Sequence, residues 1–297
     1  MNTNSRTDSR PAALASVAIV TGGAMWGLYW VPVRALGDMG LAGAWPGAAI
    51  FLAAALLLTP VVVLRARSLF ARWRQLALCG LFTGTAISLF TSSLGFTEIV
   101  RAILLFYLMP VWGTLLGVAF LGERLSVHRV AALALGLAGL AVVLGFGDGL
   151  PLPRGPGEWM AFVSGIAWAL GSTFLYRAGE IAVPEQLVAF VLGILVATGL
   201  TLFLGGDTFG AAPDRQTLLA IAPWALAGGL YALPTLFLTI WPATILTPGR
   251  IGLLLMSEVV VGVASAAFFA GEPFGPREAI GSALIVSAGF VEVLGKR

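Results

Sequence analysis

The sequence predicts an all-α polytopic membrane protein, with ten transmembrane helices arranged as two inverted five-helix repeats. Three observations lead to this fold class. Of the 297 residues, 59% are hydrophobic and only 10% are charged, which is too apolar for a water-soluble domain. The charged residues leave charge-free runs of about 20 residues, the length that a helix needs to cross hydrocarbon. A segment of the second half also matches a segment of the first.

The helices are predicted run by run, and the alternation expected of a transmembrane β-barrel is absent. The charge-free run 216–249 is divided at Trp241-Pro242, because prolines there favour the end of a helix. The predicted helices are about 13–34, 43–64, 75–96, 101–122, 130–147, 158–177, 186–206, 217–240, 250–271 and 277–294.

Basic residues predict the orientation of these helices. An even number of crossings places both termini on one side, and the positive-inside rule selects the cytoplasm of a bacterial-type inner membrane. On that assignment the cytoplasmic segments hold most of the 17 basic residues, and the loop 65–74 contributes the largest group. These residues are Arg6, Arg10, Arg65, Arg67, Arg72, Arg74, Arg124, Arg129, Arg177, Arg250, Lys296 and Arg297.

An internal repeat appears when Gly122-Glu123 is superposed on Gly271-Glu272, because Arg101 then falls on Arg250. The matched segments are the fourth and ninth predicted helices, so the repeat unit has five helices, residues 1–147 and 148–297. An odd number of crossings makes the second unit enter the membrane from the opposite side. An inverted repeat predicts alternating access around a site near the middle of the membrane.

Motifs in this order resemble the EamA branch of the drug/metabolite transporter superfamily. They are Trp26-Gly27, Pro110 followed by Glu123-Arg124-Leu125, and Glu258-Val259 ahead of Gly271-Glu272. The resemblance implies a carrier that exports amino acids or similar small metabolites, and the aromatic-rich helices are most similar to the aromatic amino acid exporters of this branch. Val259 departs from the pattern, since related sequences repeat the proline there, so we expect a helix distortion in the first half only.

Glu258 is a carboxylate in the middle of an apolar span, where a charge costs about 3 kcal/mol. One interpretation is a structural hydrogen bond to a neighbouring helix. The other is a polar point on the substrate path or a proton-binding site. The repeat places Glu258 opposite Met109, beside Pro110, which favours a central position.

Aromatic and hydroxyl side chains deep in other spans form the remainder of the predicted binding site. Helix packing explains any one of them equally well, because hydroxyl and small residues hold membrane bundles together. Taken together they describe a cavity for apolar or aromatic solutes that carry a few polar groups. The substrate-binding candidates beside Glu258 are Trp26, Trp30, Ser88, Tyr107, Trp168, Ser172 and Tyr231.

Arg101 and Arg250 are related by the repeat, one at each mouth of the predicted carrier. Arginines at span ends usually anchor helices at the membrane surface. Their equivalence also allows a role as gate residues, which attract a carboxylate or pair across a closing gap.

Enzymatic chemistry is not expected from this chain. It has one histidine, one cysteine (Cys79) and one lysine (Lys296), and it has no zinc-ligand cluster and no phosphate-binding loop. We expect no cofactor, no metal, no nucleic acid and no obligate protein partner; the partners are the lipid bilayer and a small-molecule substrate. Because only Glu258 is expected to be a buried ionisable group, facilitated diffusion or exchange is favoured. The alternatives are broad drug efflux and a structural or membrane-enzyme role.

Overall fold

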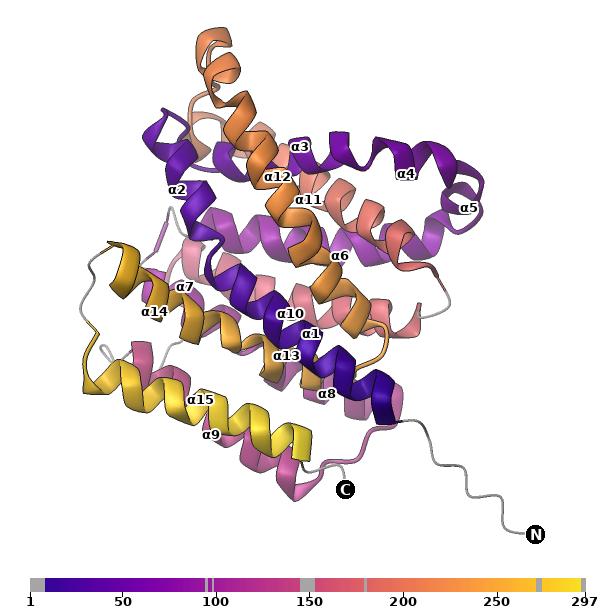
Figure 1. Ribbon diagram of the computed structural model, residues 1–297, viewed down its shortest axis with the longest axis vertical. Helices are drawn as coiled ribbons and strands as arrows, with labels where there is room; N and C mark the ends of the chain where they lie inside the picture. Colours follow the sequence, from indigo (N-terminus) through magenta and orange to yellow (C-terminus); the bar gives the residue numbers. More distant parts are fainter. Residues whose placement is uncertain are drawn as a thin grey trace.

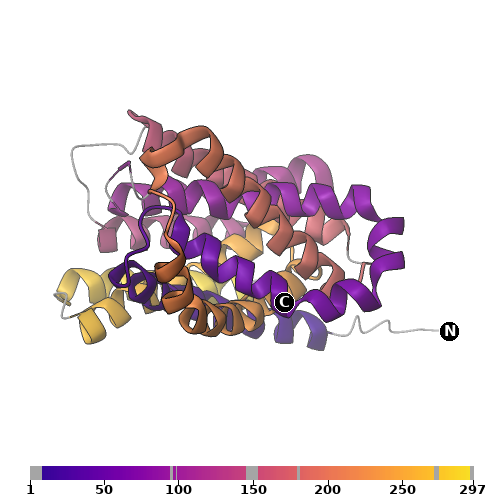
Figure 2. The ribbon, with the colours of Figure 1, turned by 90° about the horizontal axis from the view of Figure 1, so that it is seen from above.

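The computed structural model describes residues 9–93, 96–97, 99–144, 153–178, 181–270 and 274–294. All regular structure within these ranges is helical, with no strand among the described residues. Figures 1 and 2 show that the helices run largely along one direction, as in a membrane bundle. The bundle therefore has two ends, and we call the end where α1 begins and α15 ends the termini end (Figure 1).

Helices occupy each of the predicted ranges, and several of those ranges contain two helices rather than one. In chain order the helices are α1 Ser9–Gly27, α2 Trp30–Asp38, α3 Trp45–Leu57, α4 Thr59–Leu64, α5 Ala66–Ala71, α6 Trp73–Ser93, α7 Ile99–Phe106, α8 Met109–Leu121, α9 Val127–Leu144, α10 Pro156–Arg177, α11 Val183–Gly205, α12 Arg215–Ala243, α13 Pro248–Leu255, α14 Ser257–Ala270 and α15 Pro276–Leu294, with a 3-10 helix at Gly206–Phe209.

Six helical segments of the described chain are long and apolar enough to cross a membrane. Shorter apolar helices at Trp45–Leu57, Met109–Leu121 and Val127–Val142 accompany them. Many large apolar side chains on these helices are exposed, Phe203 at 83% and Phe268 at 83% among them. A surface of this kind is stable against lipid and not against water. The chain is a multi-pass membrane protein.

Two of the helical ranges are broken in the same way. The helix that begins at Ile99 stops at Phe106 and restarts at Met109, and the one that begins at Pro248 stops at Leu255 and restarts at Ser257. A shift of 149 residues brings Ile99–Phe106 onto Pro248–Leu255. The expectation of a distortion in the first half only is therefore wrong. The second break needs no proline, since it lies at Met256, before Val259, whose N–H donates to the Met256 carbonyl at 3.0 Å.

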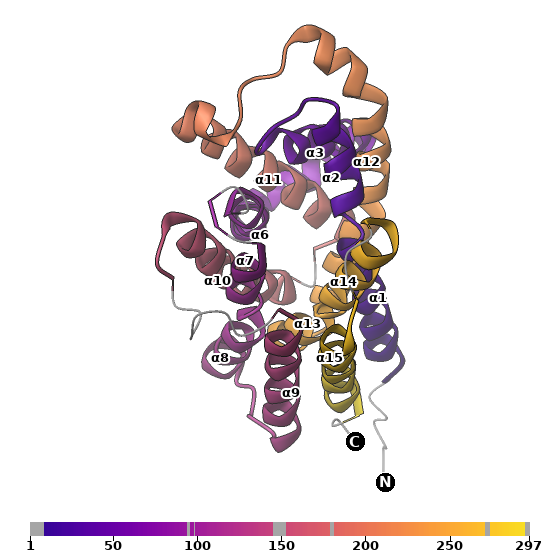
Figure 3. The same cartoon turned by 90° about the vertical axis from the view of Figure 1, so that its left-hand side faces the viewer.

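Glycines allow the helices to approach closely, as is common in membrane bundles. A Cβ on Gly139 of α9 would lie 2.7 Å from the Gly281 carbonyl oxygen of α15, and Figure 3 shows these two helices side by side at one edge of the bundle. A Cβ on Gly252 would lie 2.8 Å from the Pro110 Cα. The two broken helices thus touch directly, which places both breaks within one packed region.

The contacts between helices follow a recurring pattern. In the first half α1 packs against α12, α13 and α14, and in the second half α10 packs against α6, α7 and α8. The pairs α9 with α15 and α8 with α13 also contact one another, as do α3 and α11. Each half therefore places its first helix against three helices, two of them the parts of a broken helix.

Candidate functional site

Trp26 and Tyr231 lie together where α1 meets α12. The Trp26 indole N–H donates to the Thr239 hydroxyl at 3.1 Å, and the Tyr231 hydroxyl donates to the Met25 carbonyl at 2.5 Å. Both side chains are half-buried. Tyr29, which the sequence did not single out, packs edge-on to Trp26 with ring centroids 5.1 Å apart. These aromatic residues border the interruption between α1 and α2.

Tyr107 and Glu258 meet at the two helix breaks. Tyr107 lies in the turn between α7 and α8 and is 1% exposed. Its hydroxyl reaches the Leu255 carbonyl at 3.5 Å and interacts with the Glu258 carboxyl group. Glu258 stands in the first turn of α14, where the unpaired N–H groups and the helix dipole favour a negative charge. The carboxyl group in the middle of the span therefore belongs to a helix N-terminus.

The other predicted residues are distributed over several helix contacts. The Trp30 indole donates to the Ser265 hydroxyl at 3.0 Å. Ser88 is paired with Thr201 of α11 at 3.3 Å, and Ser172 donates to the Ala169 carbonyl of its own helix at 3.0 Å. The first two bonds join neighbouring helices, and the third lies within α10. Ser88 and Ser172 are also almost fully buried, so their hydroxyls are engaged within the protein.

Trp168 differs from these residues because its polar atom has no partner in the described structure. Its side chain is 3% exposed and packs against Phe190, with ring centroids 5.9 Å apart. The indole Nε1 is buried and makes no hydrogen bond. A buried donor of this kind costs free energy unless another molecule supplies an acceptor.

A cluster of charged and polar side chains joins four helices and the loop after α8 at the termini end; we call it the ionic cluster. Arg129 of α9 pairs with Glu292 of α15 at 2.9 Å and more loosely with Glu123 at 3.8 Å. Arg250 of α13 donates to the Ser16 hydroxyl of α1 at 2.8 Å. Arg129, Arg250 and Glu292 are each more than nine-tenths buried. The cluster ties the first half of the chain to the second.

The ionic cluster corrects the expectation that Glu258 is the only buried ionisable group. Arg129, Arg250 and Glu292 are buried, and so are Glu158 and Glu185. All five lie near helix ends, where sequence alone does not distinguish a side chain facing water from one facing another helix. One sequence signal could have indicated this burial: Glu292 is an acidic residue in the last turns of an otherwise apolar helix. Arg101 lies in α7, and its side chain is outside the described part of the structure.

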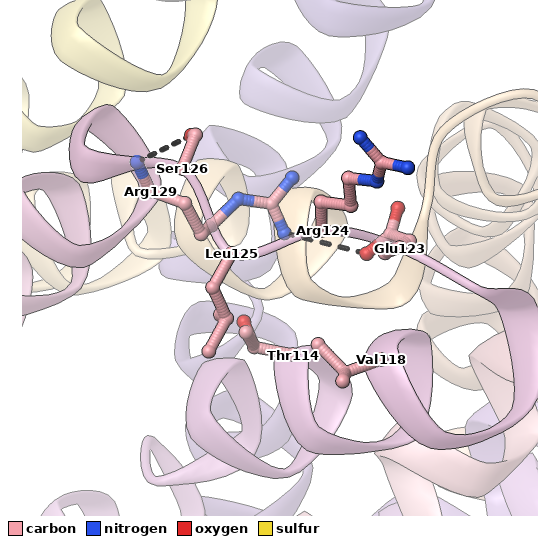
Figure 4. Close-up of a pocket in the computed structure, with 7 residues that line it drawn as sticks. All are labelled: Thr114, Val118, Glu123, Arg124, Leu125, Ser126 and Arg129. Carbon is pink, nitrogen blue, oxygen red and sulfur yellow. Dashed lines mark hydrogen bonds and ion pairs between the residues drawn. The ribbon is translucent and has the colours of Figure 1, made fainter.

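A pocket of about 260 Å³ lies beside the ionic cluster, under the loop that connects α8 to α9; we call it the loop pocket. Gly122 ends α8 in the left-handed conformation, with φ of 67°, and this turn carries Glu123 back over α8. Figure 4 shows the Thr114 hydroxyl pointing from α8 toward the charged side chains. The lining residues are Thr114, Val118, Glu123, Arg124, Leu125, Ser126 and Arg129.

Residues 13–145 match the model of the EamA-like transporter family. This part of the chain is an EamA-like domain. Together with the apolar helices, the match indicates a membrane transporter of small molecules. No curated protein matches the sequence significantly. Among the described residues no group of three or more side chains is placed to hold a metal ion.

Solved structures extend the likeness beyond the EamA-like domain. One crystal structure of a protein superposes on the chain with a TM-score of 0.70 and 21% sequence identity. The superposition covers 94% of this chain and 98% of the other. At that identity the likeness concerns the fold alone, and it includes the half of the chain that follows residue 145.

Proposed function

We propose that this protein is an alternating-access carrier that exports amino acids, aromatic and hydrophobic ones foremost, and similar small metabolites. The observation that carries the proposal is the matched pair of broken helices, with Tyr107 at one break against Glu258 at the other. Broken helices leave backbone groups free for a ligand, and in many carriers they form the binding site near the middle of the membrane. Transport follows the substrate's own gradient, by facilitated diffusion or exchange.

The architecture that we propose is ten spanning segments in two inverted five-helix repeats, 1–147 and 148–297. The contacts between helices support this architecture. If each helix is replaced by its equivalent in the other repeat, the same pairs of helices are in contact. The contacts of α1 with α12, α13 and α14 then become those of α10 with α6, α7 and α8. An inverted pair of this kind can exchange conformations, so that one central site is exposed to each side in turn.

The side chains at the breaks and on the neighbouring helices suit a hydrophobic amino acid. Glu258 supplies a partner for an ammonium group, and the unpaired Trp168 indole N–H supplies a donor for a carboxylate. Trp26 and Tyr231 offer half-buried aromatic surfaces, which pack well against apolar side chains. Ser88 contributes by joining α6 to α11, and the Ser172 hydroxyl is engaged within its own helix.

The ionic cluster is proposed as the gate that closes the termini end. It contains Arg250, one of the two arginines that the sequence predicted as gate residues. Opening that end separates Arg129 from Glu292 and Arg250 from Ser16. The positive-inside rule places this end in the cytoplasm of an inner membrane. A cysteine at position 69, in a Cys79→Ser background, tests the orientation: labelling from the cytoplasmic side is expected, and labelling only from outside contradicts it.

Flux through liposomes that contain only this protein tests the function. We expect uptake or counterflow of hydrophobic and aromatic amino acids in a screen of the twenty, with a weak response to cationic dyes. Competition by the dyes and not by amino acids would favour broad drug efflux instead. Absence of flux for every solute would favour a structural or membrane-enzyme role.

A further inference from the structure

The loop pocket is small and is lined by charges of both signs. Arg124 and Arg129 present guanidinium groups, and Glu123 presents a carboxylate, while Val118 and Leu125 supply apolar wall. With a volume of about 260 Å³, it is smaller than sites for drug-sized ligands. The pocket therefore has room for a small metabolite.

The polar groups of the loop pocket are not fully used within the protein. The Thr114 hydroxyl belongs to a residue only 4% exposed and has no hydrogen-bond partner in the described structure. Arg129 commits one nitrogen, Nη2, to Glu292 at 2.9 Å, whereas its Nη1 lies 3.8 Å from Glu123. That second distance is too long for a hydrogen bond. Nη1 and the Glu123 carboxylate thus both retain capacity for a ligand.

Two of these groups lie against the same glycine. A Cβ added to Gly249 of α13 would lie 2.5 Å from the Thr114 Oγ1 and 2.5 Å from the Arg129 Nη1. The unpaired hydroxyl and the available guanidinium nitrogen therefore lie close to each other beside Gly249, and the two oxygens of one carboxylate can accept from them. Arg124 is exposed on the same loop; in Figure 4 its side chain lies beside Glu123 and points away from Thr114, so it reaches a ligand in the pocket by rotating.

The charges select the class of ligand. A simple anion is attracted by the two arginines and repelled by Glu123, and a simple cation meets the reverse. A molecule that carries an acidic group and a primary ammonium close together satisfies both. We propose that the loop pocket binds a free α-amino acid: its carboxylate contacts Arg124, the Arg129 Nη1 and the Thr114 hydroxyl, and its ammonium contacts Glu123.

Binding of an amino acid in the loop pocket does not depend on the proposed function. The interpretation of that amino acid as the transported substrate does rest on it. The pocket lies at the termini end, away from the helix breaks, so it is a docking site at the proposed cytoplasmic mouth. A carboxylate on Arg129 also competes with Glu123, the looser of its two partners. The ethanolamine headgroup of a phospholipid carries the same pair of charges, and the experiment separates the two sources.

Cysteine protection in the full chain tests the pocket locally. Leu125 lines the pocket and is 56% exposed, so Leu125→Cys in the Cys79→Ser background reports its occupancy through reaction with a water-soluble maleimide. In phosphatidylcholine nanodiscs, L-leucine is expected to slow the reaction. The amine 3-methylbutylamine and the acid 4-methylpentanoate, which each carry one of the two charges, are expected to fail at the same concentration. Equal protection by either analogue overturns the proposal.

Matched variants locate the effect. Phe70→Cys, 80% exposed on α5 at the same end, is expected to react at one rate with and without L-leucine. Arg124→Ala should raise the half-protecting concentration of L-leucine by about tenfold, since it removes a charged hydrogen bond. Arg124→Lys should retain part of the affinity. No change with Arg124→Ala, or protection of Phe70→Cys as well, overturns the site.

Two further arms separate the causes of failure. In nanodiscs with ethanolamine phospholipid, L-leucine should still protect; protection by the lipid alone, with no added effect of L-leucine, overturns the amino acid assignment. Flux of L-leucine in liposomes is measured with the same variants. Flux without protection of Leu125→Cys overturns the pocket and leaves the carrier function standing. Protection without flux retains the pocket and overturns the carrier function.

Discussion

The two broken helices have the same backbone and different chemistry. The break between α7 and α8 is followed by Met109-Pro110, and the break between α13 and α14 is followed by Glu258-Val259. Proline removes an N–H donor and fixes one dihedral angle, which explains an interruption locally. The second break occurs without proline. The shared feature must lie in the packing of the two helices on each other.

That packing uses a glycine from each of the two helices. Gly252 of α13 lies against Pro110 of α8, and Gly113 of α8 lies against Pro248 and Gly249 of α13. Gly252 thus lets α13 rest on the first break region, and Gly113 lets α8 rest on the beginning of α13, in each case through a position with no side chain. The comparison teaches that packing between the helices, and not the local sequence, determines where both helices break. The residue that follows each break determines the chemistry there, which is apolar at Met109 and acidic at Glu258.

The largest expected effect comes from filling the contact between the two breaks. In Gly252→Val the added Cβ alone would lie 2.8 Å from the Pro110 Cα and 3.0 Å from its nitrogen, so backbone must move. We expect destabilisation of about 3 kcal/mol, seen as a lower melting temperature and poor monodispersity in detergent. Gly199→Val on α11, where nothing lies within 4 Å of the new Cβ, is the control. Equal melting temperatures for the two variants would refute the packing explanation.

The chemical difference between the breaks is tested by Glu258→Gln beside Met109→Leu. Loss of a charged partner at the second break should raise the apparent Km for amino acid by about tenfold, while Met109→Leu should leave it nearly unchanged. Counterflow is measured with and without an imposed pH gradient. We expect no gradient dependence in either protein. A dependence that is present in wild type and absent in Glu258→Gln would instead make Glu258 a proton-binding group, and an unchanged rate and affinity would make it structural.

A smaller change is expected for Tyr107→Phe, which removes only the hydroxyl that reaches Glu258 and Leu255. A typical hydrogen bond contributes about 1 kcal/mol, so apparent affinity should fall by roughly fivefold. Because the two groups interact, the double variant with Glu258→Gln should lose less than the sum of the single effects. Strict additivity of the two effects on Km would show that the pair is not coupled.

The smallest effect should follow from making the breaks alike. Val259→Pro loses one hydrogen bond, from the Val259 N–H to the Met256 carbonyl, which is about 1 kcal/mol; the first turn of a helix otherwise tolerates proline. Ala167→Pro, within the unbroken α10, should lose about 3 kcal/mol or more. Thermal melting compares them. A Val259→Pro protein as unstable as Ala167→Pro would mean that α14 does not begin where the structure places it.

The sequence predicted the helical ranges well because hydropathy and the spacing of charges are local properties. It also predicted the equivalence of Arg101 and Arg250, and the same shift of 149 residues relates α7 to α13; the central place of Glu258 stays a prediction. The role of Arg250 needed its neighbours: its bond to Ser16 joins residues more than 200 positions apart in the chain. No local pattern predicts such a partner.

The sequence by itself determined that this is a helical membrane protein, because composition and the spacing of charges already decide which segments enter lipid. Only the tertiary structure decided where the helices break, that the second break needs no proline, and that Arg129 and Glu292 are buried as a pair. The physical reason is that burial and ion pairing depend on what other helices bring to the same place. A charge near a helix end has the same sequence signature whether it meets water or another charge.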